Sequence, residues 1–175
     1  FDMLIQAGAD ISSDNNDGFQ SIHIAAQENN VHALEYLIDN GIDVNVGVTG
    51  TGQTPLLSAV HNNSHEAFDM LLHAGADIRK SNNKGWQAIH TAASKNNTKA
   101  LRYMIYKGVD ANVASETGET PLHSAVHNNI NEAVDMLIQA GADIRKSDNE
   151  GWQPIHDAAS NNNTKVLRYM IDKGV

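Results

Sequence analysis

Histidine has the widest chemical range of the residue types in this chain, because an imidazole can transfer protons near neutral pH or bind a metal ion. The 175 residues include nine histidines. His123 and His127 are four residues apart, and on a helix that spacing lets two imidazoles share one metal. No third ligand follows them at the spacing of a known metal motif, so the pair by itself does not predict a metal site.

Four of the histidines recur at one position of a repeated segment: His23, His90, His123 and His156. If successive segments stack as helices, equivalent residues lie about 8–10 Å apart. A zinc–nitrogen bond is only about 2.0–2.1 Å long, so these imidazoles could not converge on one ion. We therefore predict a structural role for them, and neither a metal nor another cofactor.

Acidic residues give no catalytic pattern either. Five aspartates recur with a strict period, which indicates that they shape loops; they are Asp10, Asp43, Asp77, Asp110 and Asp143. The sequence has no Gly-x-Ser-x-Gly elbow, no phosphate-binding glycine loop and no His-Glu-x-x-His helix. We identify no candidate catalytic residue and predict that the chain is not an enzyme.

The elements that position these residues follow from internal repetition. Each repeated aspartate ends a Gly-x-Asp triplet, and the triplets recur at intervals of 33, 34, 33 and 33 residues. A second glycine series has the same spacing and consists of Gly18, Gly52, Gly85, Gly118 and Gly151. Such a period is typical of an array of short stacked units, each of which buries its apolar face against its neighbours.

Within one period, the residues between Thr120 and Gln139 predict two helices. Thr120 can cap the first helix, and Pro121 fits its first turn. Leu122, Ala125 and Val126 then form one apolar face, and Ala133, Val134, Leu137 and Ile138 form the apolar face of the second helix. Between the helices stands an asparagine, a residue that tolerates the left-handed conformation; its equivalents are Asn29, Asn63, Asn96 and Asn162.

In these features the sequence resembles the ankyrin repeat. The signature Thr-Pro-Leu-His stands at Thr120–His123, partial copies begin at Gln20, Thr54, Gln87 and Gln153, and Ala-Ala or Ala-Val follows each. The resemblance implies an all-α solenoid of stacked helix-turn-helix pairs with hairpin-like loops. We expect one domain over residues 1–175, with a partial repeat at 1–14, full repeats at about 15–48, 49–81, 82–114 and 115–147, and an incomplete repeat at 148–175.

The resemblance has informative departures. Leu57 replaces the signature histidine, whose imidazole is expected to join neighbouring turns, and glutamine replaces the capping threonine at positions 20, 87 and 153. Neither end shows a polar capping repeat, so we interpret the chain as part of a longer array. Apolar residues at the two ends should then be exposed and could support weak self-association; they are Phe1, Leu4 and Ile5, and Leu167, Met170 and Ile171.

Composition narrows the class of partner. The formal net charge is −9, which disfavours nucleic acid as a partner. No apolar run approaches the roughly 20 residues that span a bilayer, so direct membrane insertion is not expected. Cysteine is absent and no secretory signal is visible, and we expect a cytoplasmic, intracellular protein.

The resemblance implies that a protein partner binds the loop tips and the first helix of each pair, which line the concave face. The candidate contacts are the aromatic residues that follow the second glycine series, two basic pairs, and polar residues at the ends of first helices; they are Phe19, Trp86, Trp152, Arg79, Lys80, Arg145, Lys146, His61, His127 and Lys95. For Trp86 and Trp152 two interpretations remain open, a binding anchor or local packing on the next loop.

The leading functional hypothesis is therefore a protein-interaction scaffold that binds by shape and charge. One alternative is an array that selects substrates for a larger enzyme. Another is a structural spacer, or the cytoplasmic array of a membrane protein. Flanking sequence would distinguish these alternatives.

Overall fold

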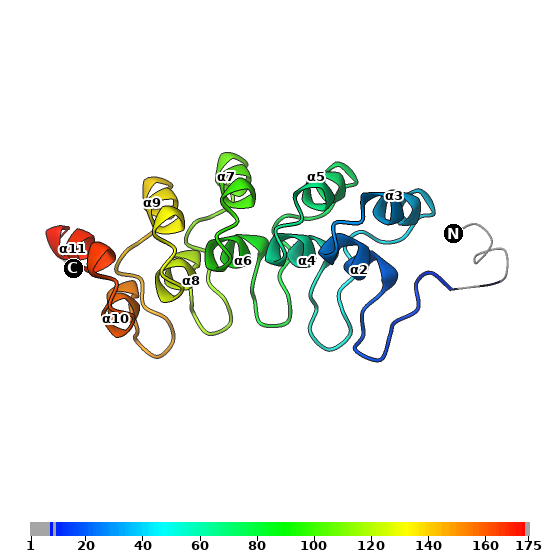
Figure 1. Ribbon diagram of the computed structural model, residues 1–175. Coiled ribbons are helices and arrows are strands. Elements are labelled where there is room, and N and C mark those ends of the chain that lie inside the picture. Colours follow the sequence, from blue (N-terminus) through cyan, green and yellow to red (C-terminus); the bar gives the residue numbers. More distant parts are fainter. Residues whose placement is uncertain (1–7, 9, 174–175) are drawn as a thin grey trace. The chain divides into compact units, whose positions relative to one another are not determined.

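The fold was analysed in a computed structural model, which describes residue 8 and residues 10–173 (Figure 1). The chain divides into two units, Phe1–Asn83 and Lys84–Val175, and each is described by itself. All regular elements of the described residues are helices, which confirms the predicted all-α repeat solenoid.

The helices come in pairs, each with a first helix of seven residues and a second of nine. The first unit contains α2 (Ser21–Gln27), α3 (Val31–Asp39), α4 (Pro55–His61) and α5 (His65–His73). The second unit contains α6 (Ala88–Ser94), α7 (Thr98–Tyr106), α8 (Pro121–His127), α9 (Asn131–Gln139), α10 (Pro154–Ser160) and α11 (Thr164–Asp172). Within each unit, first helices pack on first helices and second helices on second helices.

Residues 148–173, expected to be an incomplete repeat, hold the complete pair α10 and α11. The exact repeat boundaries and the single domain stay predictions. The predicted turn is confirmed in every pair, because the asparagine between the two helices has a positive φ of 53–58°. A side chain other than asparagine or glycine pays a steric cost in this left-handed region.

The core is formed mainly by the first helices. In α4, α6 and α8 the six residues from the first onward are all buried. The second helices bury one face, as in α9, where Ala133, Val134 and Leu137 are inside. Our prediction of a buried core at Leu122, Ala125 and Leu137 is confirmed, since each is 0% exposed.

Ile138 was expected to be buried, and this prediction was wrong. The residue is half-buried, as are its equivalents Ile38, Leu72 and Ile105. The physical reason is visible at Ile105, which lines an open groove between α7 and α9 where water reaches the side chain.

The expected exposure of the apolar ends is only partly met. Phe1, Leu4 and Ile5 lie outside the described residues. On α11, Ile171 is 61% exposed, but Leu167 is half-buried and Met170 is fully buried. Met170 was therefore assigned to the wrong face of the helix, since it lies on the side that packs against α10 and α9.

Hairpin-like loops connect successive helix pairs, and neighbouring hairpins are joined through the backbone. In the fourth hairpin, the Ser115 amide donates to the Glu119 carbonyl at 2.8 Å. Each hairpin tip then donates one amide to the carbonyl of the preceding tip at 2.9–3.1 Å. These bonds run from Thr49 to Gly18, Asn83 to Thr51, Glu116 to Lys84 and Asn149 to Thr117. Because the tips approach so closely, four members of the second glycine series have little room for a side chain, namely Gly18, Gly52, Gly85 and Gly118.

Gly118 and Gly151 give a matched test of this close approach, because both have a φ of +85°. A methyl group at Gly118 would lie 2.7 Å from the Asn149 backbone nitrogen, whereas one at Gly151 would meet nothing within 4 Å. We expect Gly118→Ala to lower the unfolding free energy by about 1–3 kcal/mol more than Gly151→Ala does, since only the first forces the backbone apart. Urea unfolding of both variants measures the difference, and equal losses would show that conformational strain alone decides the cost.

Candidate functional site

Three of the four repeated histidines lie in the core and join neighbouring repeats. Their Nδ1 atoms accept the backbone N–H of the residue that caps the helix, at 3.2 Å in each case. The ring proton must then be on Nε2, which donates to a carbonyl of the following hairpin at 3.1–3.2 Å. The donors are His23, His90 and His123, and the acceptors are the carbonyls of Val46, Glu119 and Trp152. The predicted structural role is confirmed for these three histidines.

Burial also removes the imidazoles of His23 and His90 from acid–base chemistry in solution. Desolvation lowers the pKa of His90 to about 4, and it also lowers the pKa of His23. In both cases the hydrogen bonds to backbone carbonyls act in the opposite direction and are outweighed. Both rings are therefore neutral near pH 7, when each holds two backbone groups in place.

The two remaining positions of the series differ. Leu57 is buried and fills the place of an imidazole without supplying its hydrogen bonds. His156 is exposed, and its Nδ1 accepts the Gln153 amide at 2.9 Å.

The aromatic residues that follow the second glycine series all lie against these histidines. Phe19, Trp86 and Trp152 contact His23, His90 and His156, with ring centroids 5.4–5.9 Å apart. Phe19 and Trp86 are half-buried, while Trp152 is 45% exposed. Local packing thus accounts for part of the surface of Trp86, and Trp152 is the more accessible of the two indoles.

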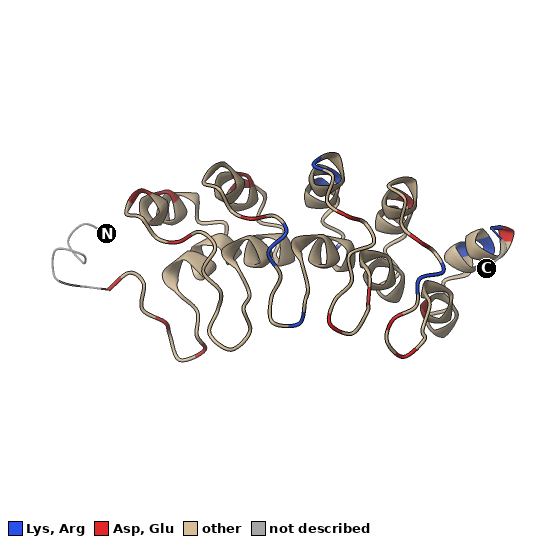
Figure 2. Ribbon diagram, turned by 180° about the vertical axis from the view of Figure 1, so that it is seen from behind, with Lys and Arg blue, Asp and Glu red and all other residues tan. Residues whose placement is uncertain are grey.

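Beside Trp152 lies an acidic groove, by which we mean the space between two hairpin tips of the second unit. Its volume is about 320 Å³, and it is lined by Glu116, Thr117, Glu119, Asp148, Asn149 and Glu150. The Asp148 carboxylate is held in place by the amides of Glu150 and Trp152, at 2.9 and 2.8 Å. Figure 2 shows acidic residues at both of these tips.

Our sequence analysis missed this groove. The signal was available, because Glu116 and Glu119 lie in one hairpin tip, Asp148 and Glu150 lie in the next, and the earlier tips carry no glutamate. Aligning the repeats by equivalent positions would have shown that acidic residues occur together in two adjacent loops. The single-residue motifs that we searched for do not reveal such a gathering.

The two basic pairs are not equivalent. Arg79, Lys80 and Arg145 are exposed, but Lys146 is half-buried. The Lys146 ammonium donates to the Asn112 carbonyl at 2.8 Å and so helps to join two hairpins. A role for Lys146 in partner binding stays a prediction, and it would compete with this bond.

The polar residues at the ends of first helices, His61, Lys95 and His127, are all exposed. His127 is engaged within the second unit, where its Nδ1 lies 3.2 Å from an Asp157 carboxylate oxygen. The structure places Trp86, Lys95, His127, Arg145, Lys146 and Trp152 in the second unit, and Phe19, His61, Arg79 and Lys80 in the first.

The described part of the chain holds neither a metal-binding cluster nor a membrane-spanning helix. It contains no group of three or more histidine or acidic residues that could hold a metal ion. Among the same residues, no helix is long and apolar enough to cross a membrane.

Comparison with known proteins agrees with the repeated helix pairs. A family model described as "Ankyrin repeats (3 copies)" matches residues 1–82 and 74–148, and one described as "Ankyrin repeats (many copies)" matches residues 131–171. The chain belongs to the ankyrin-repeat family. Ankyrin repeats generally mediate protein–protein interaction, and the family is typically non-catalytic.

Several ankyrin-repeat relatives share part of their length with this chain. It is 28% identical over 92 residues to the B-cell lymphoma 3 protein homolog of Mus musculus, and the aligned region covers 53% of the chain and 20% of that protein. It is 37% identical over 90 residues to Protein PhlB of Serratia liquefaciens, and the aligned region covers 51% of the chain and 40% of that protein. It is 38% identical over 72 residues to the human Notch-regulated ankyrin repeat-containing protein, and the aligned region covers 39% of the chain and 63% of that protein. In each case the chain covers less than two thirds of the relative.

Proposed function

We propose that this ankyrin-repeat array is a protein-interaction scaffold whose partner binds the hairpin tips and the adjoining first helices. The observation that carries the proposal is the acidic groove of the second unit, with the exposed indole of Trp152 beside it. The partner segment that fits this surface is basic. Binding requires only complementarity of shape and charge, with no bond made or broken.

Charge favours a basic partner at this place. Four carboxylates line the groove, from Glu116, Glu119, Asp148 and Glu150, and no lysine or arginine is among its lining residues. The chain as a whole has a net charge of −9, so its field attracts a cationic segment before contact. Each carboxylate can accept hydrogen bonds from a guanidinium or an ammonium group.

Trp152 adds an apolar anchor next to these charges. Its amide is bonded to Asp148, so the indole and the groove are parts of one loop. An arginine that crosses the groove can place its guanidinium over the indole face, an attraction of about 0.5–2 kcal/mol. Tryptophan is also among the residues that dominate measured interface energies.

We expect Trp152→Ala to weaken partner binding by about 2 kcal/mol, because an exposed anchor is lost while the core is untouched. The measurement is the dissociation constant of a partner isolated with the full chain, together with the melting temperature of each variant. Replacing Glu116 and Glu150 by glutamine should also weaken binding and reduce its dependence on salt. Glu132→Gln, at an exposed position of α9, is the matched control and should leave the affinity unchanged.

Replacement of the half-buried Trp86 distinguishes a binding anchor from a residue that only packs locally. If it packs locally, Trp86→Ala lowers the melting temperature and leaves the affinity per folded molecule unchanged. The proposal is wrong if Trp152→Ala behaves in the same way. If none of these substitutions changes the affinity for the partner, the result would favour a structural spacer.

A further inference from the structure

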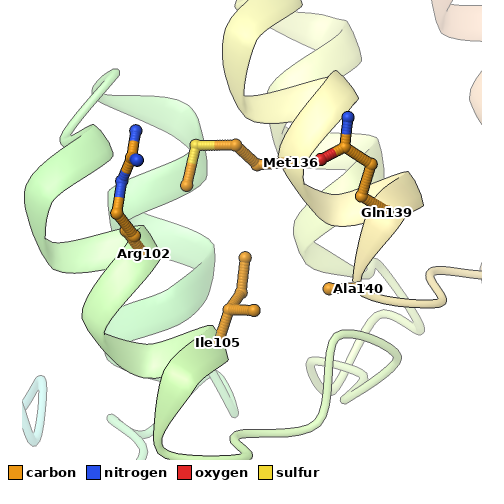
Figure 3. Close-up of a pocket in the computed structure, with 5 residues that line it drawn as sticks. All are labelled: Arg102, Ile105, Met136, Gln139 and Ala140. Carbon is orange, nitrogen blue, oxygen red and sulfur yellow. The ribbon is translucent and has the colours of Figure 1, made fainter.

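The second helices of the second unit enclose a separate groove, which we call the α7–α9 groove. It has a volume of about 300 Å³ and is lined by Arg102, Ile105, Met136, Gln139 and Ala140. Figure 3 shows the Met136 side chain reaching from α9 toward α7, with Arg102 and Ile105 opposite it. The floor is thus apolar, and a guanidinium stands at one end.

The residue type at this position of the repeat varies, and Arg102 stands where three of the other four second helices have an acidic residue. The equivalent residues of the other second helices are Glu35 on α3, Asp69 on α5 and Asp135 on α9, and α11 carries Arg168. Helix α7 has Lys99 and Arg102, is followed by Lys107, and contains no acidic residue. On a chain with a net charge of −9, this helix is a local basic patch, and Figure 2 shows it in blue.

The groove also exposes apolar surface that the fold does not use. Arg102, Ile105 and Tyr106 are at positions i, i+3 and i+4 of α7 and share one helix face. Tyr106 is 82% exposed, and Ile105 and Met136 are half-buried. A volume near 300 Å³ is at the lower limit for ligand pockets, which suits a side chain of a partner better than a whole small molecule.

We propose that the α7–α9 groove binds an acidic segment of a protein partner that carries a large aliphatic side chain. The aliphatic group packs between Ile105 and Met136, and a neighbouring carboxylate accepts two hydrogen bonds from the Arg102 guanidinium. Charge complementarity selects this occupant. The groove and the acidic groove at the hairpin tips differ in charge, so one surface can fail its test while the other passes.

The test uses the full chain and a short synthetic peptide with leucines on one helix face and glutamates elsewhere. Binding is followed by fluorescence anisotropy and by the methyl NMR signals of Ile105 and Met136. We expect both methyl signals to shift on titration, and a version of the peptide with lysine in place of glutamate should not shift them. A version with serine in place of leucine should bind more weakly.

Arg102→Glu is the decisive variant, because it gives α7 the residue type that α3 carries at Glu35 and so should fold normally. We expect it to weaken peptide binding by about tenfold or more, since attraction becomes repulsion. Glu35→Gln is the matched control and should change nothing. Unshifted methyl signals, or equal affinity of Arg102→Glu and the unaltered chain, would overturn the proposal. So would a concentration-dependent dimer of the chain that Arg102→Glu abolishes, because the occupant would then be a second copy.

Discussion

Replacing Leu137 with alanine is expected to lower the free energy of unfolding by about 2–5 kcal/mol, because the side chain is completely buried and its removal leaves a cavity. Leu137 lies on the face of α9 that packs into the array, together with Ala133 and Val134. In an array of repeats each unit is stabilised by its neighbours, so the loss should also weaken the adjoining pairs. Chemical denaturation, monitored by circular dichroism, measures the loss of unfolding free energy.

Ile138 provides the control for this prediction. It is next to Leu137 in the same helix and loses a similar amount of apolar surface on truncation, but water already reaches it in the folded state. Ile138→Ala should therefore cost clearly less than Leu137→Ala. Equal losses from the two variants would mean that Ile138 is as fully buried in solution as Leu137.

Acidification is expected to destabilise the fold through His90. The unfolded side chain has a pKa of 6.5, whereas burial lowers the pKa to about 4 in the folded state. Between these values the unfolded chain binds more protons, so stability is fully present above about pH 6.5 and is lost as the pH falls. At pH 4.5 the titration of His90 alone lowers the free energy of unfolding by roughly 2–3 kcal/mol.

His90→Leu isolates this contribution, because leucine already stands at the equivalent position 57 and is buried there. The variant should be less stable at pH 7, where it lacks two hydrogen bonds. Its stability should then fall less steeply than that of the unaltered chain between pH 7 and pH 4.5. Parallel pH profiles of the two proteins would show that His90 is protonated in the folded state.

The sequence predicted the repeat well because its strongest signals are local. The asparagine turns, the proline at the start of α8 and the apolar faces of its first turns depend on a few neighbouring residues, and a 33-residue period repeats each signal. The bond from His123 to the next hairpin was anticipated for a different reason, namely the resemblance to a family in which that residue has this role.

The features that were missed depend on distances between repeats. Glu116 and Asp148 are far apart in sequence, and only the stacking of two hairpins makes them line one groove. Ile138 was assigned to the core because its helical spacing is correct, although spacing does not show how deeply a neighbouring helix covers it. Trp86 and Trp152 look alike in sequence, but Trp86 is half-buried and Trp152 is 45% exposed, and the spacing of the two residues does not predict this difference.

The hydrogen bonds between hairpin tips give the array a direction. Each tip from the second to the fifth donates an amide to a carbonyl of the tip before it, as Asn149 does to Thr117 and Glu116 does to Lys84. A repeat inserted or removed in frame would meet the same acceptor before it and the same donor after it. Duplication or deletion of whole periods would therefore lengthen or shorten this protein and keep the hydrogen bonds between neighbouring tips. Insertion or deletion of only part of a period would leave a donor and an acceptor mismatched.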